Sequence, residues 1–317
     1  MAKLYDETID RFQEPIKVYL NIKTKELLED DCEIFGFNSR NKFYNVLITN
    51  YVNDYINHIE IDSKQTLAIM ENLISTDSKE EFPIIAKKIV YKNISFEDIK
   101  ERSDYISLRI NIDSIIQIAE IISATNEDIK FSAFFRDLFS NYLSLPVYRR
   151  EQIIFNDQYK KIMKSIENKQ KISYWNKNTR KSHNLSVHSI EQSRIEFHNY
   201  VVGSSDNYAG AYSIKLSSIG SVRLLDEKSC FNNTFNECYE VMKRNGCQFG
   251  VEAPEIWKVY LTDDDIKIYN NRYLDRPKIR KKGVDDKGKY YVFDCSKFQL
   301  EGYFNPFGGR IECIKLN

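Results

Sequence analysis

The chain has 317 residues, which is enough for two or three domains. Its 46 lysines and arginines balance its 46 aspartates and glutamates, so no overall positive field draws in a polyanion. The six cysteines lack the CxxC or CxxH spacing of a zinc site, and no apolar run suits a signal peptide or a membrane span. We therefore expect a cytoplasmic protein without a metal, a cofactor or a membrane partner.

A strand followed by two helices is predicted twice in the N-terminal half. The first copy covers residues 16–22, 24–35 and 39–55, and the second covers 106–112, 113–123 and 127–143. The Leu-Asn-Ile of residues 20–22 returns as Ile-Asn-Ile 90 residues later, at 110–112. The Asn-Tyr pair of the second helix returns 91 residues later. The pattern indicates a tandem repeat.

Both predicted strands alternate with period two, so each has an apolar and a polar face. The apolar positions are Val18, Leu20 and Ile22 in the first strand and Leu108, Ile110 and Ile112 in the second. A single strand of this length cannot bury one face or satisfy its edges, so two strands should pair above four helices. The pairing is expected either within one chain or between two chains.

The order strand, helix, helix resembles the ribbon-helix-helix family, whose paired strands enter a DNA major groove and read base edges. The resemblance implies the following contacts on the polar face: Lys17, Tyr19, Asn21, Lys23, Arg109 and Asn111. In this family the second helix binds phosphate at its N-terminus. Arg40 and Lys42 suit that role in the first copy, whereas Glu127 and Asp128 oppose it in the second. The alternative is a ribbon used only for packing or dimerisation.

Two helices at residues 63–74 and 82–91 are expected to connect the repeats. After Arg149 the pattern changes to short strands at 171–175, 184–190, 195–202, 211–216 and 221–225. This even spacing, with turn residues between the strands, predicts a small β-barrel.

The barrel segment resembles the WYL domain through KISYW at 171–175, NYVVG at 199–203, YSIKLSSI at 212–219 and VRLL at 222–225. Of the family's Trp-Tyr-Leu triplet only Tyr200 remains, and Ser218 stands where an arginine is usual. The resemblance implies an Sm-like barrel with a basic cleft for a nucleotide or nucleic acid. We assign to this cleft Tyr174, Arg180, Lys181, Arg194, Tyr200 and Lys215. Aromatic rings among cations suit single-stranded nucleic acid, although the rings, with Trp175, are alternatively barrel core.

The last ninety residues predict a small α/β sandwich, with helices at 232–245 and 263–273 and strands at 256–261, 289–294 and 310–316. A further helix is expected between the last two strands. Segments 272–277 and 304–314 resemble the extension that follows WYL domains and that dimerises in several relatives. The resemblance implies a homodimer, with Arg272 and Arg276 as secondary nucleic-acid contacts.

No residue pattern specifies catalysis. The histidines (His58, His183, His188 and His198) lack a neighbouring nucleophile motif, and the three aspartates at 263–265 suit a helix N-terminus better than a metal. We therefore expect a protein that is not an enzyme.

The fold class expected is α+β: a ribbon-helix-helix-like helical module (1–148), a WYL barrel (149–228) and a C-terminal extension (229–317). The combination resembles the accessory proteins encoded beside the RNA-guided ribonucleases of type VI-D CRISPR systems. It implies a non-enzymatic protein that binds single-stranded RNA and modulates the ribonuclease effector. The alternatives are a DNA-binding transcriptional regulator with a ligand-sensing WYL domain, and an interaction protein whose ribbon only dimerises.

Overall fold

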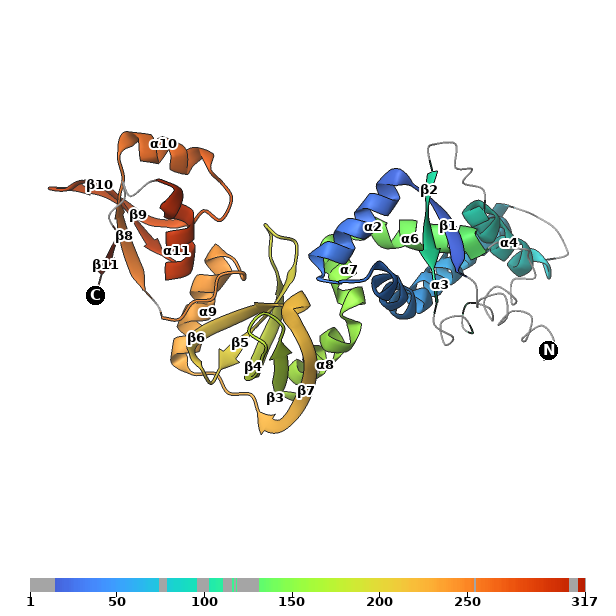
Figure 1. Cartoon of the computed structure of the whole chain (residues 1–317), viewed down its shortest axis with the longest axis horizontal. Coiled ribbons are helices and arrows are strands. Elements are labelled where there is room, and N and C mark those ends of the chain that lie inside the picture. Colours follow the sequence, from blue (N-terminus) through green and yellow to red (C-terminus); the bar gives the residue numbers. More distant parts are fainter. Residues whose placement is uncertain are drawn as a thin grey trace. The chain divides into compact units, whose positions relative to one another are not determined.

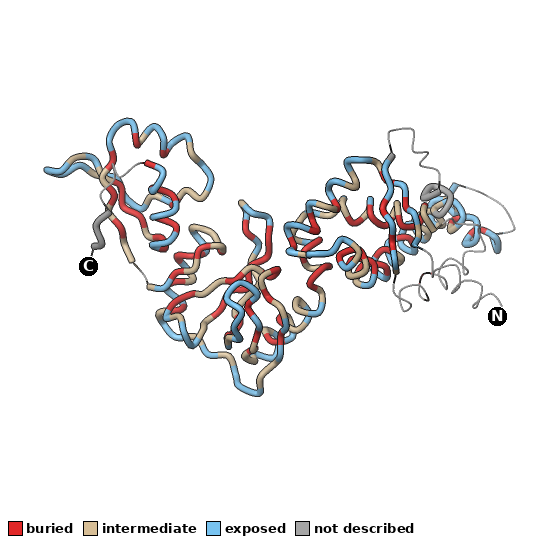
Figure 2. The backbone as a smooth tube through the Cα atoms, viewed as in Figure 1, coloured by how far each residue is buried: buried red, intermediate tan, exposed pale blue. Residues whose placement is uncertain are grey.

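A computed structural model of the protein describes residues 15–73, 79–95, 103–110, 116, 118, 131–253, 255–307 and 313–316. The chain divides into two compact units, Met1–Ile154 and Phe155–Asn317, called here the N-terminal and C-terminal units (Figure 1). Helices and three antiparallel sheets occur together, which confirms the predicted α+β class. Figure 2 shows the buried residues gathered inside each unit.

The predicted ribbon forms within the chain, where β1 (Ile16–Asn21) pairs antiparallel with β2 (Ser103–Leu108). Lys17 lies opposite Ser107, which is its equivalent at the repeat offset of 90. A strand position that pairs with its own equivalent lies on a local two-fold axis. Val18, Leu20 and Leu108 are buried on the inner face, as predicted, whereas Ile22 follows the strand and is 40% exposed.

The second strand begins and ends earlier than the predicted 106–112. To extend the hydrogen-bonded pairing beyond Leu108, Arg109 would have to pair with Pro15, which has no backbone N–H to donate. Arg109 instead donates its N–H to Asn41 Oδ1 at 3.0 Å, and its carbonyl accepts from Asn45 at 2.7 Å. Ile110 therefore follows the strand, and Ile112 lies outside the described residues.

The helices of the N-terminal unit are α2 (Ile22–Ile34), α3 (Arg40–Leu73), α4 (Phe82–Ser95), α6 (Phe131–Ser144) and α7 (Val147–Ile154). Asn21 caps α2, and Gly36 in the left-handed region (φ 74°) follows its end. The prediction of separate helices at 39–55 and 63–74 is wrong, because α3 runs through both without a glycine or proline to end it. Most of the predicted helix 113–123, and the start of the helix at 127, lie outside the described residues.

Equivalent residues of the two copies meet in the core of the N-terminal unit. The rings of Tyr51 and Tyr142, 91 residues apart, lie 5.9 Å apart in an edge-to-face arrangement. The Tyr142 hydroxyl donates to Asp31 at 2.9 Å, and Arg150 forms an ion pair with the same carboxylate at 3.1 Å. A buried charge cluster thus joins α2, α6 and α7.

The C-terminal unit opens with α8 (Asn156–Asn168) and a five-stranded sheet of β3 (Gln170–Asn176), β4 (Lys181–Gln192), β5 (Asn199–Ser205), β6 (Tyr208–Lys215) and β7 (Ile219–Lys228). The strand order β6-β5-β4-β3-β7 is open in the described residues, so the predicted closed barrel is not found. At the outer edge of β6, Ala211 exchanges backbone hydrogen bonds with Val251 at 2.8 and 2.9 Å. That bridge, together with the packing of α9 (Asn233–Asn245) on β6, covers the edge that closure would need.

The last part of the C-terminal unit has the order strand, helix, strand, strand, helix, strand. Its elements are β8 (Ile256–Tyr260), α10 (Asp263–Asn271), β9 (Ile279–Asp285), β10 (Gly288–Asp294), α11 (Lys297–Phe304) and β11 (Cys313–Leu316). They form a four-stranded antiparallel sheet in the order β11-β8-β10-β9. Strand β9 is absent from the sequence prediction because its lysines and Gly283 leave no apolar alternation.

Replacing either of two glycines with alanine is expected to change the stability in opposite directions. A Cβ at Gly210 would lie 2.1 Å from the Val251 carbonyl oxygen, whereas a Cβ at Gly302, inside α11, meets nothing within 4 Å. Gly210→Ala should therefore destabilise the protein by roughly 1–3 kcal/mol through overpacking. Gly302→Ala should stabilise it by about 0.5–1 kcal/mol through helix propensity. Urea unfolding of both variants tests this, and two shifts of the same sign would contradict it.

Candidate nucleic-acid interface

The outer face of the ribbon presents one cation and two tyrosine rings. Tyr19 and Tyr105 lie opposite each other, each about half exposed, with ring centroids 5.9 Å apart. The ammonium of Lys17 lies 5.4 Å from the Tyr105 ring centroid. Sequence reasoning missed Tyr105 because it started the second strand at residue 106, three residues after its first residue, Ser103. The face is suited to stacking and to phosphate contact.

The other predicted ribbon contacts lie away from this face or have other roles. The Asn21 side chain accepts from the Lys23 backbone N–H at 2.9 Å as the cap of α2. Lys23 is exposed in the first turn of that helix. Arg109 is exposed just beyond β2, and Asn111 lies outside the described residues.

The predicted phosphate site at the start of α3 is partly neutralised. Arg40 forms an ion pair with Glu29 at 2.9 Å, and the Lys42 backbone N–H donates to the Ser39 hydroxyl at 3.4 Å. An acidic residue of the first helix thus competes with an anion for Arg40. The matching helix start of the second copy lies outside the described residues.

The residues assigned to the cleft of the five-stranded sheet fall into separate groups. Tyr174 is buried, and its hydroxyl donates to Tyr212 at 3.2 Å, so its ring belongs to the core. Burial raises the pKa of the Tyr174 hydroxyl. Arg180 is exposed in the turn between β3 and β4, where it takes a left-handed backbone conformation (φ 53°), and Lys181 is exposed as the first residue of β4. Trp175 is 41% exposed.

Tyr200 and Lys215 come together around a carboxylate, and the Tyr200 ring is buried in a hydrophobic core cluster with Val202. The Tyr200 hydroxyl donates to Glu196 at 2.5 Å, and the Lys215 ammonium lies 2.8 Å from the same group and 5.8 Å from the Tyr200 ring centroid. Burial opposes ionisation of Glu196, yet the hydrogen bonds from Lys215 and Tyr200 outweigh it and lower the pKa of that carboxyl. Glu196 therefore offsets the positive charge predicted for this cleft.

This neutralisation gives a testable prediction. Glu196→Gln leaves the Lys215 charge without its counter-ion, so single-stranded RNA that contacts this cleft should bind several-fold more tightly. The slope of log affinity against log salt should steepen by about 0.7, the value for one added phosphate contact. Fluorescence anisotropy across a salt series measures both quantities. An unchanged affinity and slope would show that RNA does not contact this cleft.

The sixth residue assigned to the cleft, Arg194, lines a basic pocket with a volume of about 550 Å³. The pocket lies between the β4–β5 loop, the end of α9 and the segment before β9. Its charged lining consists of Arg194, Lys243, Arg244, Arg276 and Lys278 against Glu191 alone. This set is called the basic pocket below.

Two cations of the basic pocket are available to a ligand. Among the described residues, the side chains of Arg194 and Lys278 have no ion-pair or hydrogen-bond partner. Arg244, in contrast, pairs with Asp294 at 2.6 Å, and the Arg276 guanidinium lies 4.6 Å from the Tyr273 ring centroid. The sequence signals were Lys243 and Arg244 in the last turn of α9 and the basic run at 272–289. Nothing in the sequence shows that these two segments lie together.

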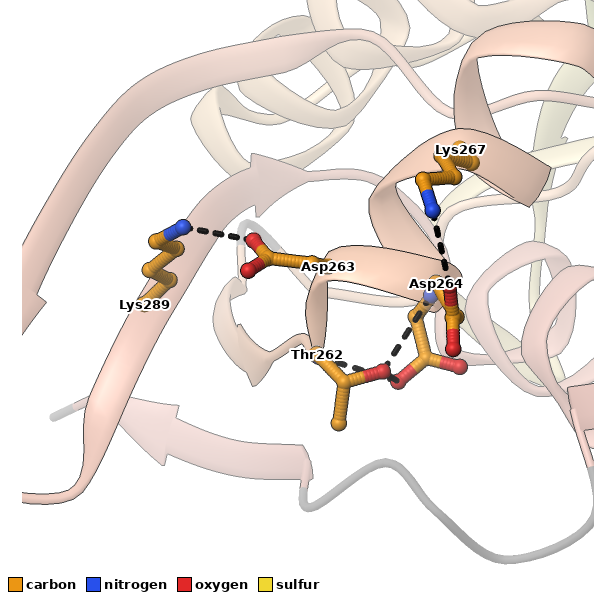
Figure 3. A network of polar contacts seen from close by, with 6 residues as sticks. Thr262, Asp263, Asp264, Lys267 and Lys289 are labelled. Atoms are coloured by element: carbon orange, nitrogen blue, oxygen red, sulfur yellow. Dashed lines mark hydrogen bonds and ion pairs between the residues drawn. The ribbon is translucent and has the colours of Figure 1, made fainter.

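The three aspartates at the start of α10 have structural roles (Figure 3). Asp263 pairs with Lys289 at 2.5 Å, and Asp264 pairs with Lys267 at 3.0 Å. Asp265 forms a capping box with Thr262. Within the residues that the structure describes, no group of three or more His, Cys, Asp or Glu side chains is placed to hold a metal. None of the described helices has the length and hydrophobicity to cross a bilayer.

Fold and surface together define an α+β protein whose sheets present tyrosines among cations, a pattern typical of nucleic-acid binding. No known protein-family model and no curated protein matches the sequence. The fold is similar to a crystal structure described as that of a CRISPR Cas-related protein. The TM-score is 0.64 and the identity 18%, over 96% of this chain and 89% of that chain. Proteasome accessory factor B/C of Arthrobacter aurescens gives a TM-score of 0.28 at 9% identity, over 69% of this chain and 35% of that chain.

Proposed function

We propose that this protein is a CRISPR-associated accessory protein that binds single-stranded RNA and modulates an RNA-guided ribonuclease without itself being an enzyme. The observation that carries the proposal is the basic pocket, which is lined by five cations. Lys243 and Arg244 pair with Glu240 and Asp294, whereas the side chains of Arg194 and Lys278 have no ion-pair partner among the described residues. A chain with no net charge gains no general attraction to a polyanion, so binding must come from such a local cluster. The likeness to a CRISPR Cas-related protein over nearly the whole chain supports the biological setting.

The proposal includes the type of each folded module and the oligomeric state. The intrachain ribbon, with Lys17 opposite its repeat equivalent, supports a ribbon-helix-helix-like module. The strand sequence of the five-stranded sheet, with Tyr200 on β5, supports a WYL-like domain despite the open sheet. The homodimer remains part of the proposal, and the exposed Tyr273, Leu274 and Phe298 of the C-terminal unit offer apolar surface for it.

A DNA-binding regulator is the second candidate, because the ribbon has the local two-fold relation that suits a duplex operator. Only Lys17 among the predicted basic contacts lies on its outer face, whereas Arg40 is paired with Glu29. A protein that recognises base edges in the major groove needs more polar side chains than the outer face of the ribbon presents. The ribbon therefore favours DNA less than the basic pocket favours RNA.

The proposal is tested by adding the purified protein to a reconstituted type VI-D ribonuclease with its guide RNA and following cleavage of a labelled target. We expect the cleavage rate to change with protein concentration. The protein alone should leave the labelled RNA intact. Cleavage that is unaffected at every concentration would overturn the accessory role, and cleavage by the protein alone would overturn the non-enzymatic assignment.

A further inference from the structure

The four-stranded sheet has the topology of a known RNA-binding module. Its element order βαββαβ and strand order β11-β8-β10-β9 describe a split βαβ fold. RNA-recognition modules stack bases on aromatic side chains of such a four-stranded sheet. A fold topology does not by itself imply RNA binding, so the side chains on the face that the helices leave uncovered must be considered.

Both helices cover one face of this sheet. The core cluster joins Trp257, Val259 and Phe293 of the strands to Tyr269 of α10 and Tyr303 of α11. Side chains alternate along a strand, so the residues between these positions point to the opposite face. That face, called here the outer face, is covered by neither α10 nor α11.

Two tyrosines lie side by side on the outer face. Tyr260 of β8 is directly opposite Tyr290 of β10, on the two central strands, and their ring centroids are 5.9 Å apart. Both are partly exposed. Opposite Tyr290 on β9 is Gly283, where a Cβ would lie 2.4 Å from the tyrosine ring. Only a glycine lets that ring lie across the edge strand.

Cations surround these rings. The Lys258 ammonium lies 3.9 Å from the Tyr290 ring centroid and 4.9 Å from that of Tyr260. Lys281, which pairs with Val292, is exposed on the same face, and the Lys287 ammonium lies 5.8 Å from the Tyr260 ring centroid. Tyrosines among lysines on an open sheet meet the two needs of single-stranded nucleic acid, which are stacking and phosphate contact.

One carboxylate opposes this arrangement. Asp285 accepts a hydrogen bond from the Tyr260 hydroxyl at 2.9 Å and pairs with Lys258. A base that stacks on Tyr290 must move the Lys258 ammonium from the ring. The stacked base must therefore replace the contacts that the Lys258 ammonium makes with the two rings.

We propose that the outer face of the four-stranded sheet is a second binding site for single-stranded RNA, which stacks bases on Tyr260 and Tyr290 and contacts phosphates through Lys281 and Lys287. The inference deepens the proposed function, on which it rests, by giving the RNA a platform separate from the basic pocket.

The test uses the full-length protein and a labelled uridine-rich single-stranded RNA in fluorescence anisotropy across a salt series. Replacing Tyr260 and Tyr290 together with alanine should weaken binding about fivefold or more for each stacked base, with little change in the salt slope. The matched variant, with phenylalanine at both positions, keeps the rings and should bind like the wild type. A single-stranded DNA of the same sequence shows whether the platform distinguishes the two nucleic acids.

A second variant does not depend on the tyrosines. Lys281→Glu changes an exposed side chain, so it should leave the fold intact while lowering affinity and making the salt slope shallower. If the alanine pair and Lys281→Glu both bind like the wild type while basic-pocket variants bind weakly, the platform is refuted and the proposed function stands. If the wild type binds no single-stranded nucleic acid, both are refuted.

Discussion

Replacing Asp31 with asparagine is expected to lower the free energy of unfolding of the N-terminal unit by about 3–5 kcal/mol. Asp31 is 1% exposed and is the carboxylate that the buried Arg150 faces, at 3.1 Å. It also accepts the Tyr142 hydroxyl hydrogen bond at 2.9 Å. Asparagine keeps the shape but leaves the Arg150 charge without a counter-ion among three packed helices.

The matched control is Asp157→Asn, which breaks the exposed pair of Asp157 with Lys161 at 2.8 Å. Such a surface pair within one helix is worth about 0.3–0.5 kcal/mol. Scanning calorimetry should therefore show a melting temperature lower by roughly 6–20 °C for Asp31→Asn and nearly unchanged for the control. Similar shifts for the two variants would show that the buried pair does not hold α2, α6 and α7 together.

The second large effect is expected at the basic pocket. Exchanging Arg194 and Lys278 together for glutamate should weaken single-stranded RNA binding at least tenfold at 0.15 M salt. The loss of two phosphate contacts makes the slope of log affinity against log salt shallower by about 1.4, which corresponds to roughly tenfold at this concentration. Both side chains are exposed, so the fold should be retained.

A control of equal charge change separates a local contact from general attraction. Lys160 and Lys164 are exposed on α8 and do not line the basic pocket. Their joint exchange for glutamate alters the net charge by the same amount. If both double variants weaken binding equally, the effect is one of total charge and the pocket is not the site.

The ribbon of the N-terminal unit was predictable from the repeat. Lys17 pairs with Ser107 at the offset of 90, and Tyr51 contacts Tyr142 at the offset of 91. The limits of the helices were less predictable, because the helical pattern of α3 continues past its apolar face without a stop signal. Strand β9 was missed because its polar residues are exposed on both faces.

The candidate site was predictable only in part, because it depends on contacts between distant residues. Tyr174 and Tyr200 are both buried, yet the hydroxyl of Tyr174 donates to Tyr212 and that of Tyr200 donates to Glu196. No spacing rule places the Glu196 carboxylate against Lys215, or Arg194 in one pocket with Lys278. Pairing across strands and between a loop and a helix end decides these contacts.

Binding to single-stranded RNA is measured by fluorescence anisotropy with single-stranded RNA, single-stranded DNA and duplex DNA of matched length. Each ligand is titrated across a salt series, because phosphate contacts set the slope. We predict the tightest binding to single-stranded RNA, with a preference that persists as salt rises because stacking is independent of ion release. Tight, sequence-specific binding to the duplex, with weak binding to RNA, would contradict this account and make the protein an operator-binding regulator.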